Sequence, residues 1–341
     1  MPEKIAVIGA GSWGTALSIL LSGNGHRVRV WSRSENEVSM INSLREHKSK
    51  LPGVRIPENI EFTSDLEMSL AGSDVVVMVV PSQTIRNNAR EISKYIKKGT
   101  LIVHCSKGFE EGSGMRLSEV IRQEIPESMV VVLSGPSHAE EVGRQIPTTV
   151  VSACEDRRAA EYVQDIFMSS KFRVYTNPDV TGVEIGAALK NVIALCAGIS
   201  DGLGFGDNTK AALMTRGITE IARLGTVMGA KPETFAGLSG IGDLIVTCTS
   251  MHSRNRRAGI LIGQGMPLDE VLKEVKMVVE GVTTTKAAYE LANRMNVQMP
   301  ITAEAYRVLF EGKSAKQAVA DLMMRNRKFE MEEVAEGSKW L

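Results

Sequence analysis

The residue with the clearest potential for acid–base chemistry is Lys190, which lies in an apolar, helical-looking segment over residues 185–195. A lysine partly removed from water in such surroundings can have its pKa lowered toward neutral pH, and it can then donate or accept a proton. The alternative is a lysine that extends its amine back into water along an apolar surface. The residues alone leave both interpretations open, and Lys190 is the candidate catalytic residue.

Two further charged residues could act with this lysine. Asp243 lies in a turn of small residues, 240–244, which would let the chain and a ligand come close, so we expect it to orient the Lys190 amine and to contact substrate. A helix cap or an Asx turn is its alternative role. Lys107 follows a predicted strand and could reach both a cofactor and a substrate. The alternative is a lysine at the edge of the site that contacts neither ligand.

The densest basic stretch of the chain, Ser253-Arg254-Asn255-Arg256-Arg257, has the composition of a phosphate site. An arginine fork matches phosphate oxygens, and neighbouring serine and asparagine side chains add neutral hydrogen bonds. A charge run is more often a solvated helix face or a partner for nearby acids. The stretch is therefore a candidate site for a phosphorylated ligand, and a solvated or ion-paired helix face stays open as the alternative.

A glycine-rich turn near the amino terminus indicates a dinucleotide. The run Gly9-Ala10-Gly11-Ser12-Trp13-Gly14 directly follows an apolar strand and opens a helix predicted over residues 15–21. In that context the first glycine permits a tight turn, the second lets the backbone approach a pyrophosphate, and the third permits close helix packing. The anion would then lie against the helix amino terminus. A glycine-rich turn without a ligand is the less favoured interpretation.

The end of the second strand distinguishes the two nicotinamide dinucleotides. NAD sites place a carboxylate there, which bonds the ribose 2′-hydroxyl and repels a 2′-phosphate. Here Trp31-Ser32-Arg33-Ser34 offers a guanidinium and two hydroxyls, which suits the phosphate of NADP. Arg33 could also be a solvated loop arginine or stack on adenine. We predict that NADP(H) is preferred and that NAD(H) is possible.

These residues need a scaffold, and the first half of the chain predicts a parallel sheet with crossover helices. Nearly continuous apolar runs alternate with helical patterns, as in strands covered on both faces. The predicted strands are residues 5–8, 27–31, 75–80, 101–104, 130–133, 148–151 and 172–175. The expected fold class is α/β, with a Rossmann-type doubly wound parallel sheet in residues 1–179 that binds NAD(P). Polar residues follow three of the strands at the edge where a ligand would lie.

After residue 179 the composition becomes helical, with almost no strand signal. We expect a mainly α-helical substrate-binding and catalytic domain over residues 180–341. Its glycine-rich connector, residues 201–206, separates two long helices, the second predicted over residues 214–228.

Composition limits the classes of partner. The 341-residue chain has 40 basic and 40 acidic side chains and a formal net charge of zero, so nothing favours nucleic acid or an anionic membrane. No apolar run has the length of a membrane span or the form of a signal peptide. The four cysteines have no paired spacing, and the five histidines form no metal-ligand cluster. We expect a cytoplasmic protein with small-molecule partners, no metal site and no stable membrane insertion.

Several motifs follow one another in a characteristic order: the glycine-rich turn, then residues 105–108, 133–137, 184–191, 240–244 and 253–255. In this order they resemble bacterial NAD(P)-dependent glycerol-3-phosphate dehydrogenases over essentially the whole chain. The resemblance implies reversible hydride transfer between NAD(P)H and dihydroxyacetone phosphate, giving sn-glycerol 3-phosphate for glycerophospholipid synthesis. It also implies a homodimer, since relatives are often dimers.

The resemblance gives Lys190 the acid–base role and brings Val278 and Glu280 to the cofactor. Thr283 and Thr284 are of a residue type that caps helices well, so we expect them to cap the helix that follows this segment. The expected cofactor contacts are Gly9, Gly11, Ser12, Trp13, Gly14, Arg33, Lys107, Ser137, Ala139, Arg254, Val278 and Glu280. The expected substrate contacts are Lys107, Gly135, Ser137, Lys190, Asp243, Ser253, Arg254 and Asn255. His138 stands where many relatives have phenylalanine and could alter the pocket wall. Arg256 and Arg257 are expected to be structural.

Two other functions stay open because a fold does not fix a substrate. One is a hydroxyacid or hydroxyacyl dehydrogenase with the same two-domain plan, which would place its anion contacts outside the arginine cluster. The other is a non-catalytic NADPH sensor, in which replacement of Lys190 would change neither cofactor affinity nor function.

Overall fold

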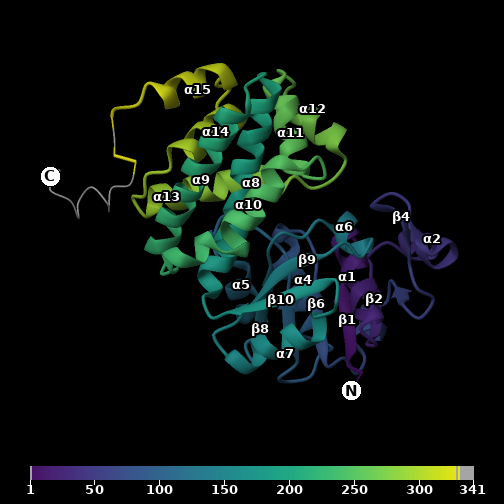
Figure 1. The fold of residues 1–341 in the computed structure, drawn as a ribbon. Coiled ribbons are helices and arrows are strands. Elements are labelled where there is room, and N and C mark those ends of the chain that lie inside the picture. The colour runs from purple at the N-terminus through teal and green to yellow at the C-terminus, as the bar shows by residue number, and fades with distance from the viewer. Residues whose placement is uncertain (1, 328, 331–341) are drawn as a thin grey trace.

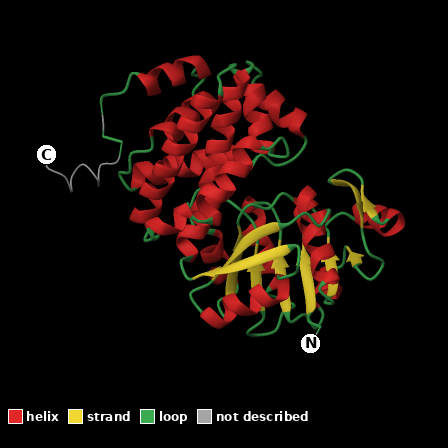
Figure 2. Cartoon of the chain, viewed as in Figure 1, coloured by secondary structure: helices red, strands yellow, loops and turns green. Residues whose placement is uncertain are grey.

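The computed structural model describes residues 2–327 and 329–330, which form two lobes (Figure 1; Figure 2). The first lobe is a sheet with helices on both faces, and it contains the amino terminus. The second lobe begins at Val180, and its described residues form helices joined by loops, with no strand. The predicted strand-end residues and the predicted helical residues meet where the two lobes join.

An eight-stranded sheet forms the centre of the first lobe. In spatial order it contains β10 (Phe172–Asn177), β9 (Thr148–Ala153), β8 (Val130–Ser134), β7 (Leu101–His104), β6 (Val75–Met78), β1 (Lys4–Ile8), β2 (Arg27–Trp31) and β5 (Glu61–Thr63). All of the predicted strands are present. β6 ends two residues before its predicted end, so Val79 and Val80 belong to the loop at the ligand edge.

The sheet is parallel from β5 to β8, whereas β9 and β10 run in the opposite direction. β8 pairs with β9 antiparallel, and β9 pairs with β10 parallel. The doubly wound α/β prediction is confirmed, but the prediction of a wholly parallel sheet is wrong at this edge. Apolar runs show that a strand is covered on both faces and carry no information on its direction. The connection from β8 to β9 holds only one short helix, α6 (Ala139–Gly143).

Alternate residues of the central strand β1 enter two different apolar cores. Ile5 and Val7 pack into the core beneath α1 (Ser12–Gly23) and α7 (Arg157–Phe167). Ala6 and Ile8 pack on the opposite face, in the core beneath α4 (Ile85–Ile92) and α5 (Leu117–Glu124). Since both faces are covered, the strands read as continuous apolar runs, which is why the sequence reveals them.

Three short strands are not apparent in the sequence. β5 pairs with β2 at the sheet edge, and β3 (Glu46–His47) pairs with β4 (Leu51–Arg55) in a separate hairpin after α2 (Glu35–Leu44). These strands are only two, five and three residues long for β3, β4 and β5, and β4 contains a Pro-Gly pair, which usually marks a turn. The short helix α3 (Leu66–Leu70) and a 3₁₀ turn, Ser82–Thr84, complete the lobe.

The second lobe is built around α8 (Val180–Gly202), the helix that carries Lys190. Helices packed around or beyond it are α9 (Asp207–Val227), α10 (Asp243–Thr249), α11 (Arg254–Gly263), α12 (Leu268–Val275), α13 (Glu280–Arg294), α14 (Pro300–Phe310) and α15 (Ala315–Met323). By length and composition alone α8 could cross a membrane, but 94% of that apolar window is buried inside the protein. Its apolarity is therefore that of a core helix.

Glycines bring α8 and α11 into backbone contact. A Cβ on Gly198 would lie 2.0 Å from the Arg256 carbonyl oxygen, and one on Gly259 would lie 2.1 Å from the Leu195 carbonyl oxygen. Contacts below 3 Å are not tolerated, so no larger residue fits in this seam without moving a helix. The seam couples the helix of Lys190 directly to the helix that begins with the basic stretch.

Candidate active site

Lys190 and Asp243 meet at the junction of the two lobes. The Lys190 Nζ donates to Asp243 Oδ1 at 2.8 Å and to Thr247 Oγ1 at 2.7 Å, and all three side chains are buried. Lys107, which follows β7, donates from Nζ to Asp243 Oδ2 at 2.6 Å and to the Gly135 carbonyl oxygen at 3.0 Å. One carboxylate thus bridges a lysine from each lobe, and the structure brings these predicted residues together.

Local structure explains how Asp243 reaches this position. It is the first residue of α10 and follows a single π-helical turn, Leu238–Gly242. Gly186 on α8 lets that turn approach, because a Cβ there would lie 2.6 Å from the Ser239 carbonyl oxygen. Thr247, one turn further along α10, is a further contact of Lys190 that was not among the residues predicted from the sequence. Thr247 follows Asp243 by four residues, and residues with that spacing are neighbours on one face of a helix. This spacing could have indicated that Thr247 lies beside the predicted site.

Burial lowers the pKa of Lys190 to about 8; the Asp243 carboxylate opposes that shift, and Lys107 adds to it. Burial by itself would raise the pKa of Asp243, but the charges of Lys107 and Lys190 hold it below its ordinary value. The cluster therefore contains an ionised carboxylate beside an amine that changes protonation near neutral pH. An ammonium has three N–H groups, and two are used here, so one is left for a substrate oxygen.

The basic stretch forms the start of α11. Ser253 is the N-cap of that helix, and its hydroxyl accepts a hydrogen bond from the Arg256 backbone N–H. Asn255 is buried among three helices, where its Nδ2 donates to Asn191 Oδ1 at 2.9 Å and its Oδ1 accepts from the Gly281 N–H at 2.8 Å. These bonds fix the turn and leave one N–H of Asn255 for a ligand.

The three arginines of this stretch have different surroundings. Arg256 is ion-paired with Asp201, with an Nη2–Oδ2 distance of 2.7 Å, and Arg257 is exposed. Arg254 is half-buried; burial lowers its pKa, and the Glu280 charge opposes that shift. Arg254 is therefore the arginine that an incoming anion would stabilise most.

Glu280 links the helical lobe to the sheet lobe. It accepts hydrogen bonds from the Ser82 N–H at 3.1 Å and from the Ser82 hydroxyl at 2.5 Å, and burial raises its pKa. Val278, by contrast, is 45% exposed. The helix α13 begins at Glu280 itself, so the prediction that Thr283 and Thr284 cap it is wrong; both lie inside the first turns.

The glycine-rich turn has the shape that a dinucleotide needs. A Cβ on Gly9, whose φ is +113°, would lie 2.5 Å from the Val79 carbonyl oxygen, and one on Gly14 would lie 1.9 Å from the Gly9 carbonyl oxygen. A Cβ on Gly11 would meet nothing within 4 Å. Gly11 caps α1 without a side-chain acceptor, which leaves the first amides of the helix for an anion. Trp13 packs partly buried against the apolar core. These residues fit a pyrophosphate.

The turn after β2 and the start of α2 expose Arg33 together with Glu35. The next acid, Glu37, is half-buried and accepts hydrogen bonds from the Ser32 hydroxyl and from Lys50 Nζ, both at 2.5 Å. Lys50 was also not among the residues predicted from the sequence. Its carbonyl oxygen accepts from the Ser12 hydroxyl at 2.6 Å, which ties the β3–β4 hairpin to the glycine-rich turn. Since this lysine comes from a hairpin that the sequence does not reveal, no sequence signal could place it.

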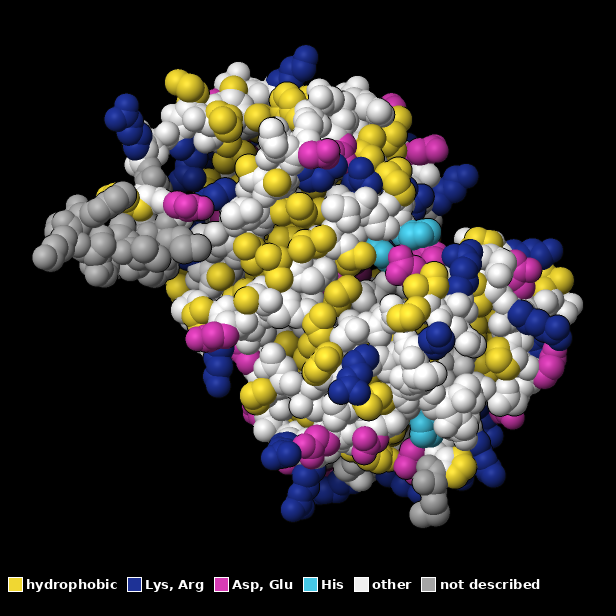
Figure 3. All heavy atoms as spheres, in the orientation of Figure 1, with side chains coloured by type: hydrophobic (Ala, Val, Ile, Leu, Met, Phe, Trp, Pro, Cys, Tyr) yellow, Lys and Arg dark blue, Asp and Glu magenta, His cyan; other side chains and the backbone are white. Residues whose placement is uncertain are grey.

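The residues after β8 line the same junction. The Ser137 hydroxyl donates to the Gly135 carbonyl oxygen at 2.8 Å, and Ala139 begins α6. The His138 ring lies 5.7 Å from the His252 ring, and burial, with the charge of Lys190, lowers the pKa of His138. Histidine and acidic side chains are visible where the two lobes meet (Figure 3). His138 is therefore part of the wall near Lys190.

Comparison with known families decides what kind of protein has this site. A model of the amino-terminal part of NAD-dependent glycerol-3-phosphate dehydrogenase matches residues 4–160, and a model of its carboxyl-terminal part matches residues 179–320. The chain belongs to the NAD-dependent glycerol-3-phosphate dehydrogenase family. The resemblance seen in the motifs is thereby confirmed.

Individual relatives agree with this family. The chain is 57% identical to a glycerol-3-phosphate dehydrogenase of the NAD(P)+ type from Desulfitobacterium hafniense, over 97% of this chain and 94% of the relative. A crystal structure of glycerol-3-phosphate dehydrogenase from Coxiella burnetii has 38% sequence identity to this chain. The two structures superpose with a TM-score of 0.92, over 95% of this chain and 99% of that one. A ketopantoate reductase from Ralstonia eutropha, at 14% identity and a TM-score of 0.61 over 92% and 99% of the two chains, shares the fold alone.

Glu184 ties α8 to the sheet lobe of this glycerol-3-phosphate dehydrogenase family member. Its Oε1 accepts from His104 Nε2 at 3.1 Å and from the Ser118 N–H at 2.8 Å. Its Oε2 accepts from Arg116 Nη1 at 2.8 Å and from the Ser118 hydroxyl at 2.5 Å. Burial would raise the pKa of Glu184, but these donors hold it at about 2, so the carboxylate is ionised. Nothing in the sequence singles out this residue.

Replacement of Glu184 by alanine is expected to lower kcat about 100-fold, the scale that a displacement near 1 Å can cause, while NADPH affinity stays within about threefold. The reason is that His104 ends β7 just before Lys107, and Glu184 shares α8 with Lys190. Their contact therefore sets the separation of the two lysines. Steady-state kinetics and an NADPH titration, both well below the melting temperature, measure the effect.

A matched control is Glu220→Gln. Glu220 is also a buried carboxylate of the helical lobe, and it accepts hydrogen bonds from the Ile301 and Thr302 N–H groups at the start of α14. This variant is expected to lose stability and to keep its kcat. Ser118→Ala, which removes one donor and keeps the Glu184 carboxylate, should show a smaller kcat loss. Equal kcat losses in the Glu184 and Glu220 variants would contradict the positioning role.

Proposed function

We propose that this chain catalyses the reversible reduction of dihydroxyacetone phosphate to sn-glycerol 3-phosphate with NADPH or NADH, the step that supplies glycerophospholipid synthesis. The observation that carries the proposal is the buried cluster of Lys190, Asp243 and Lys107 where the lobes meet, in a chain of this family. The names of the relatives support the substrate and the use of NAD(P)+.

Lys190 is the proton donor for reduction in this proposal. When bound, the reduced nicotinamide supplies the hydride that the keto carbon accepts. Negative charge then develops on the carbonyl oxygen, where the free N–H of Lys190 donates, and its proton passes to that oxygen. Asp243 and Thr247 hold the amine in place through its other two N–H groups. In the oxidation direction the neutral amine takes the proton back from the hydroxyl group.

The substrate phosphate is assigned to the start of α11. Ser253, Arg254 and Asn255 offer a hydroxyl, a guanidinium and one free amide N–H at the helix amino terminus. Gly135 and Ser137, beside Lys107, are assigned to the substrate from the sheet side. The desolvation that lowers the pKa of Arg254 supports an anionic partner for this arginine.

The dinucleotide is assigned to the ligand edge of the sheet, with NADP(H) preferred over NAD(H). The open backbone at Gly11 and the uncapped α1 support the pyrophosphate position. The full set of assigned contacts is Gly9, Gly11, Ser12, Trp13, Gly14, Arg33, Lys107, Ser137, Ala139, Arg254, Val278 and Glu280. We also propose a cytoplasmic homodimer, with domains over residues 1–179 and 180–341 and no nucleic-acid or membrane partner.

The test is NADPH oxidation by the purified chain with dihydroxyacetone phosphate, run beside unphosphorylated dihydroxyacetone and beside NADH. We expect turnover with the phosphate ester and a loss of kcat/KM of at least about 1000-fold without the phosphate, because remote phosphate contacts stabilise the transition state. A folded protein that binds NADPH and turns over neither ketone would overturn the proposal and favour the sensor. Turnover of a hydroxyacid instead would favour the other dehydrogenase class.

Arg33→Ala is expected to raise the KM for NADPH about tenfold and to leave the KM for NADH within about twofold, because only NADPH carries the 2′-phosphate. Initial rates with varied coenzyme at saturating dihydroxyacetone phosphate measure both constants. Arg158, an exposed arginine on α7 in the same lobe, provides the control variant Arg158→Ala. An equal rise for both coenzymes would instead indicate that Arg33 stacks on adenine.

The pKa of Lys190, lowered to about 8, predicts opposite pH limbs for the two directions. Ketone reduction needs the protonated amine, so its kcat is expected to fall as pH rises through about 8. Glycerol 3-phosphate oxidation needs the neutral amine, so its kcat is expected to rise through the same pH. Saturating both substrates at each pH isolates kcat. If kcat instead changed in the same sense with pH in both directions, the titrating group would not be Lys190.

A further inference from the structure

Lys50 lies at the ribose end of the proposed coenzyme site, and none of the assigned coenzyme contacts uses it. It directly precedes β4 in the β3–β4 hairpin, and its side chain is 36% exposed. The hairpin is anchored, because Leu51 and Val54 of β4 are buried in the core of the sheet lobe and pack against α6 at Gly143. The backbone of Lys50 therefore has a fixed position, whereas its side chain is partly open to solvent.

The two ends of Lys50 contact the two elements that a coenzyme ribose would join. Its carbonyl oxygen accepts from the Ser12 hydroxyl at 2.6 Å, next to the turn assigned to the pyrophosphate. Its Nζ donates to Glu37 Oε1, and Glu37 Oε2 accepts from the Ser32 hydroxyl, both at 2.5 Å. Ser32 follows β2, at whose end the ribose 2′ group of a dinucleotide lies. Lys50 therefore spans the same two points as the adenosine ribose.

Glu37 holds the Lys50 amine at this strand end. Its Oε1 also lies 3.1 Å from Nε2 of His47, whose side chain is fully buried. Burial would raise the pKa of Glu37, but its hydrogen bonds to His47, Lys50 and Ser32 hold it at about 2. The carboxylate is therefore ionised and fixed in place, and it is a permanent partner for the amine.

The amine keeps donors for a second anion. An ammonium has three N–H groups, and Lys50 gives one of them to Glu37, so two are left. Arg33, which follows Ser32, is exposed on the same turn, with Glu35 as the nearby opposing charge. A phosphate at the end of β2 would meet an ammonium and a guanidinium, which are strong donors to phosphate oxygens. A ribose hydroxyl group needs neither cation.

We propose that Lys50 is a coenzyme-specificity residue whose ammonium binds the 2′-phosphate of NADPH next to Arg33, with Glu37 as its positioning residue. This inference rests on the proposed function, because it deepens the assignment of NADPH to this edge of the sheet. With NADH, which carries a hydroxyl group at that position, the ammonium stays with Glu37. Lys50 therefore contributes to the affinity for NADPH and not to the affinity for NADH.

The test measures coenzyme binding without any ketone. NADPH and NADH are titrated separately into the full chain and into Lys50→Met, with nicotinamide fluorescence as the signal, well below the melting temperature of each protein. We expect Lys50→Met to weaken NADPH binding about tenfold, for one charged contact, and to change NADH binding by less than about twofold. Lys50→Arg, which keeps the charge, should retain most of the NADPH affinity. Unchanged NADPH binding in Lys50→Met, or equal losses for the two coenzymes, would overturn the proposal.

A second pair of variants separates direct contact from an effect through Glu37. Removal of Lys50 leaves the Glu37 carboxylate without its counter-ion, and that carboxylate would itself repel a phosphate. Lys50→Met is therefore repeated in a Glu37→Gln background, which has no carboxylate at this position. Direct contact predicts a loss of NADPH affinity of about tenfold in that background too. No loss there would show that Lys50 acts only through Glu37, and the proposal would be wrong.

Lys48→Met is the matched control, because Lys48 is an exposed lysine in the loop of the same hairpin. Its NADPH affinity is expected to stay within about twofold of the parent value, since a solvated charge without a phosphate contact contributes little. An NADPH loss as large as that of Lys50→Met would assign the effect to the general charge of the hairpin and overturn the proposal.

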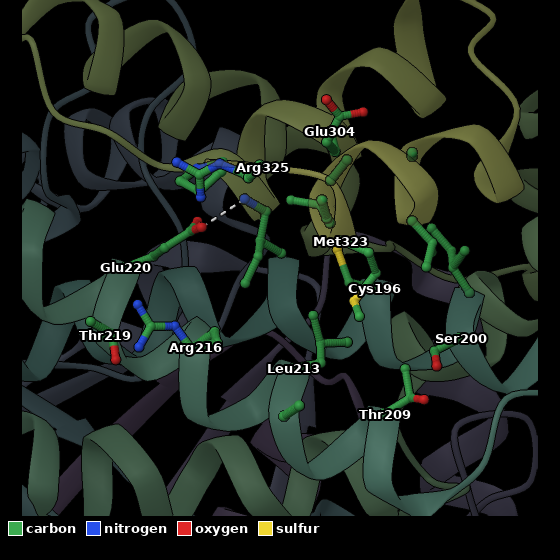
Figure 4. A pocket seen from close by; sticks show the side chains of 18 of the residues that line it. Cys196, Ser200, Thr209, Leu213, Arg216, Thr219, Glu220, Glu304, Met323 and Arg325 are labelled. Atoms are coloured by element: carbon green, nitrogen blue, oxygen red, sulfur yellow. Dashed lines mark hydrogen bonds between the residues drawn. The ribbon is translucent and has the colours of Figure 1, made fainter. Parts of the chain in front are cut away.

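A cavity in the helical lobe provides a second control. It has a volume of about 560 Å³, and its lining includes Arg216, Glu220 and Arg325 (Figure 4). A phosphorylated ligand that entered this cavity would also change the fluorescence signal. Arg216→Ala is expected to leave the affinities for both coenzymes within about twofold of the parent values. If it weakened NADPH binding while Lys50→Met did not, the signal would come from the cavity and the proposal would be wrong.

The same titrations distinguish failure of this proposal from failure of the proposed function. A parent chain that binds neither coenzyme would overturn both. A parent chain that binds both coenzymes and reduces dihydroxyacetone phosphate, but whose ratio of NADPH to NADH affinity is unchanged in Lys50→Met, would overturn the role of Lys50 alone.

Discussion

Lys190→Ala is expected to lower kcat for dihydroxyacetone phosphate reduction by about 1000-fold, within the range of about 100- to 10,000-fold that a general acid contributes. The affinity for NADPH should stay within about threefold, because the glycine-rich turn that fits the coenzyme belongs to the other lobe. Single-turnover kinetics with enzyme-bound NADPH measure the chemical step, and a fluorescence titration measures the coenzyme affinity.

Small primary amines provide a control for this variant. The alanine leaves space beside Asp243 and Thr247, which hold the amine in the parent protein. Methylammonium is therefore expected to restore part of the lost rate in Lys190→Ala and to leave the parent enzyme unaffected. A variant that keeps a tenth or more of the parent kcat would show that Lys190 is not the proton donor.

Asp243→Asn is expected to lower kcat by about 100-fold and to move the pH limb of reduction down by about one to three units, the shift that loss of a nearby opposite charge produces. Asparagine keeps the shape of the side chain but removes the charge that Lys107 and Lys190 share. The two lysines then repel one another without compensation, so Lys190 loses its proton at lower pH. The pH dependence of kcat measures both effects.

Asp201→Asn is a closely matched control for this substitution. Asp201 also lies between two cations, Lys210 at 2.8 Å and Arg256 at 2.7 Å, in the same helical lobe. Its replacement is expected to lower the melting temperature and to leave the pH limb in place. If both aspartate variants moved the limb equally, the shift would reflect the net charge of the lobe rather than contact with Lys190.

The sequence was sufficient for the sheet because its central strands are covered on both faces and therefore appear as apolar runs. It was insufficient for the direction of β9 and for β3, β4 and β5, where short or charged segments depend on neighbours that are distant in sequence. The glycine-rich turn and Lys107 follow two of these apolar strands directly, so their positions at the strand ends could be predicted from the sequence as well.

The candidate site was predictable where a residue type itself carries the chemistry. A lysine in an apolar helix and a basic stretch stand out, and the structure places Lys190 beside Asp243 as expected. Thr247, Lys50 and Glu184 do not stand out, because threonine, lysine and glutamate are common and their contacts arise only when α10, the hairpin and α8 meet other elements. The roles of all the predicted site residues, Arg33 and Val278 among them, stay predictions.

The backbone contact between α8 and α11 has a consequence for the size of substrate that this site can accept. Because Gly198 and Gly259 leave no space between the two helices, neither can slide along the other, and Lys190 keeps a fixed distance from the turn that begins with Ser253. In the proposed assignment, where Lys190 is the acid and this turn holds the phosphate, the site then selects substrates by the number of bonds between the carbonyl group and the phosphate. We expect a homologous substrate with one carbon more or fewer to reach the acid or the phosphate site, but not both.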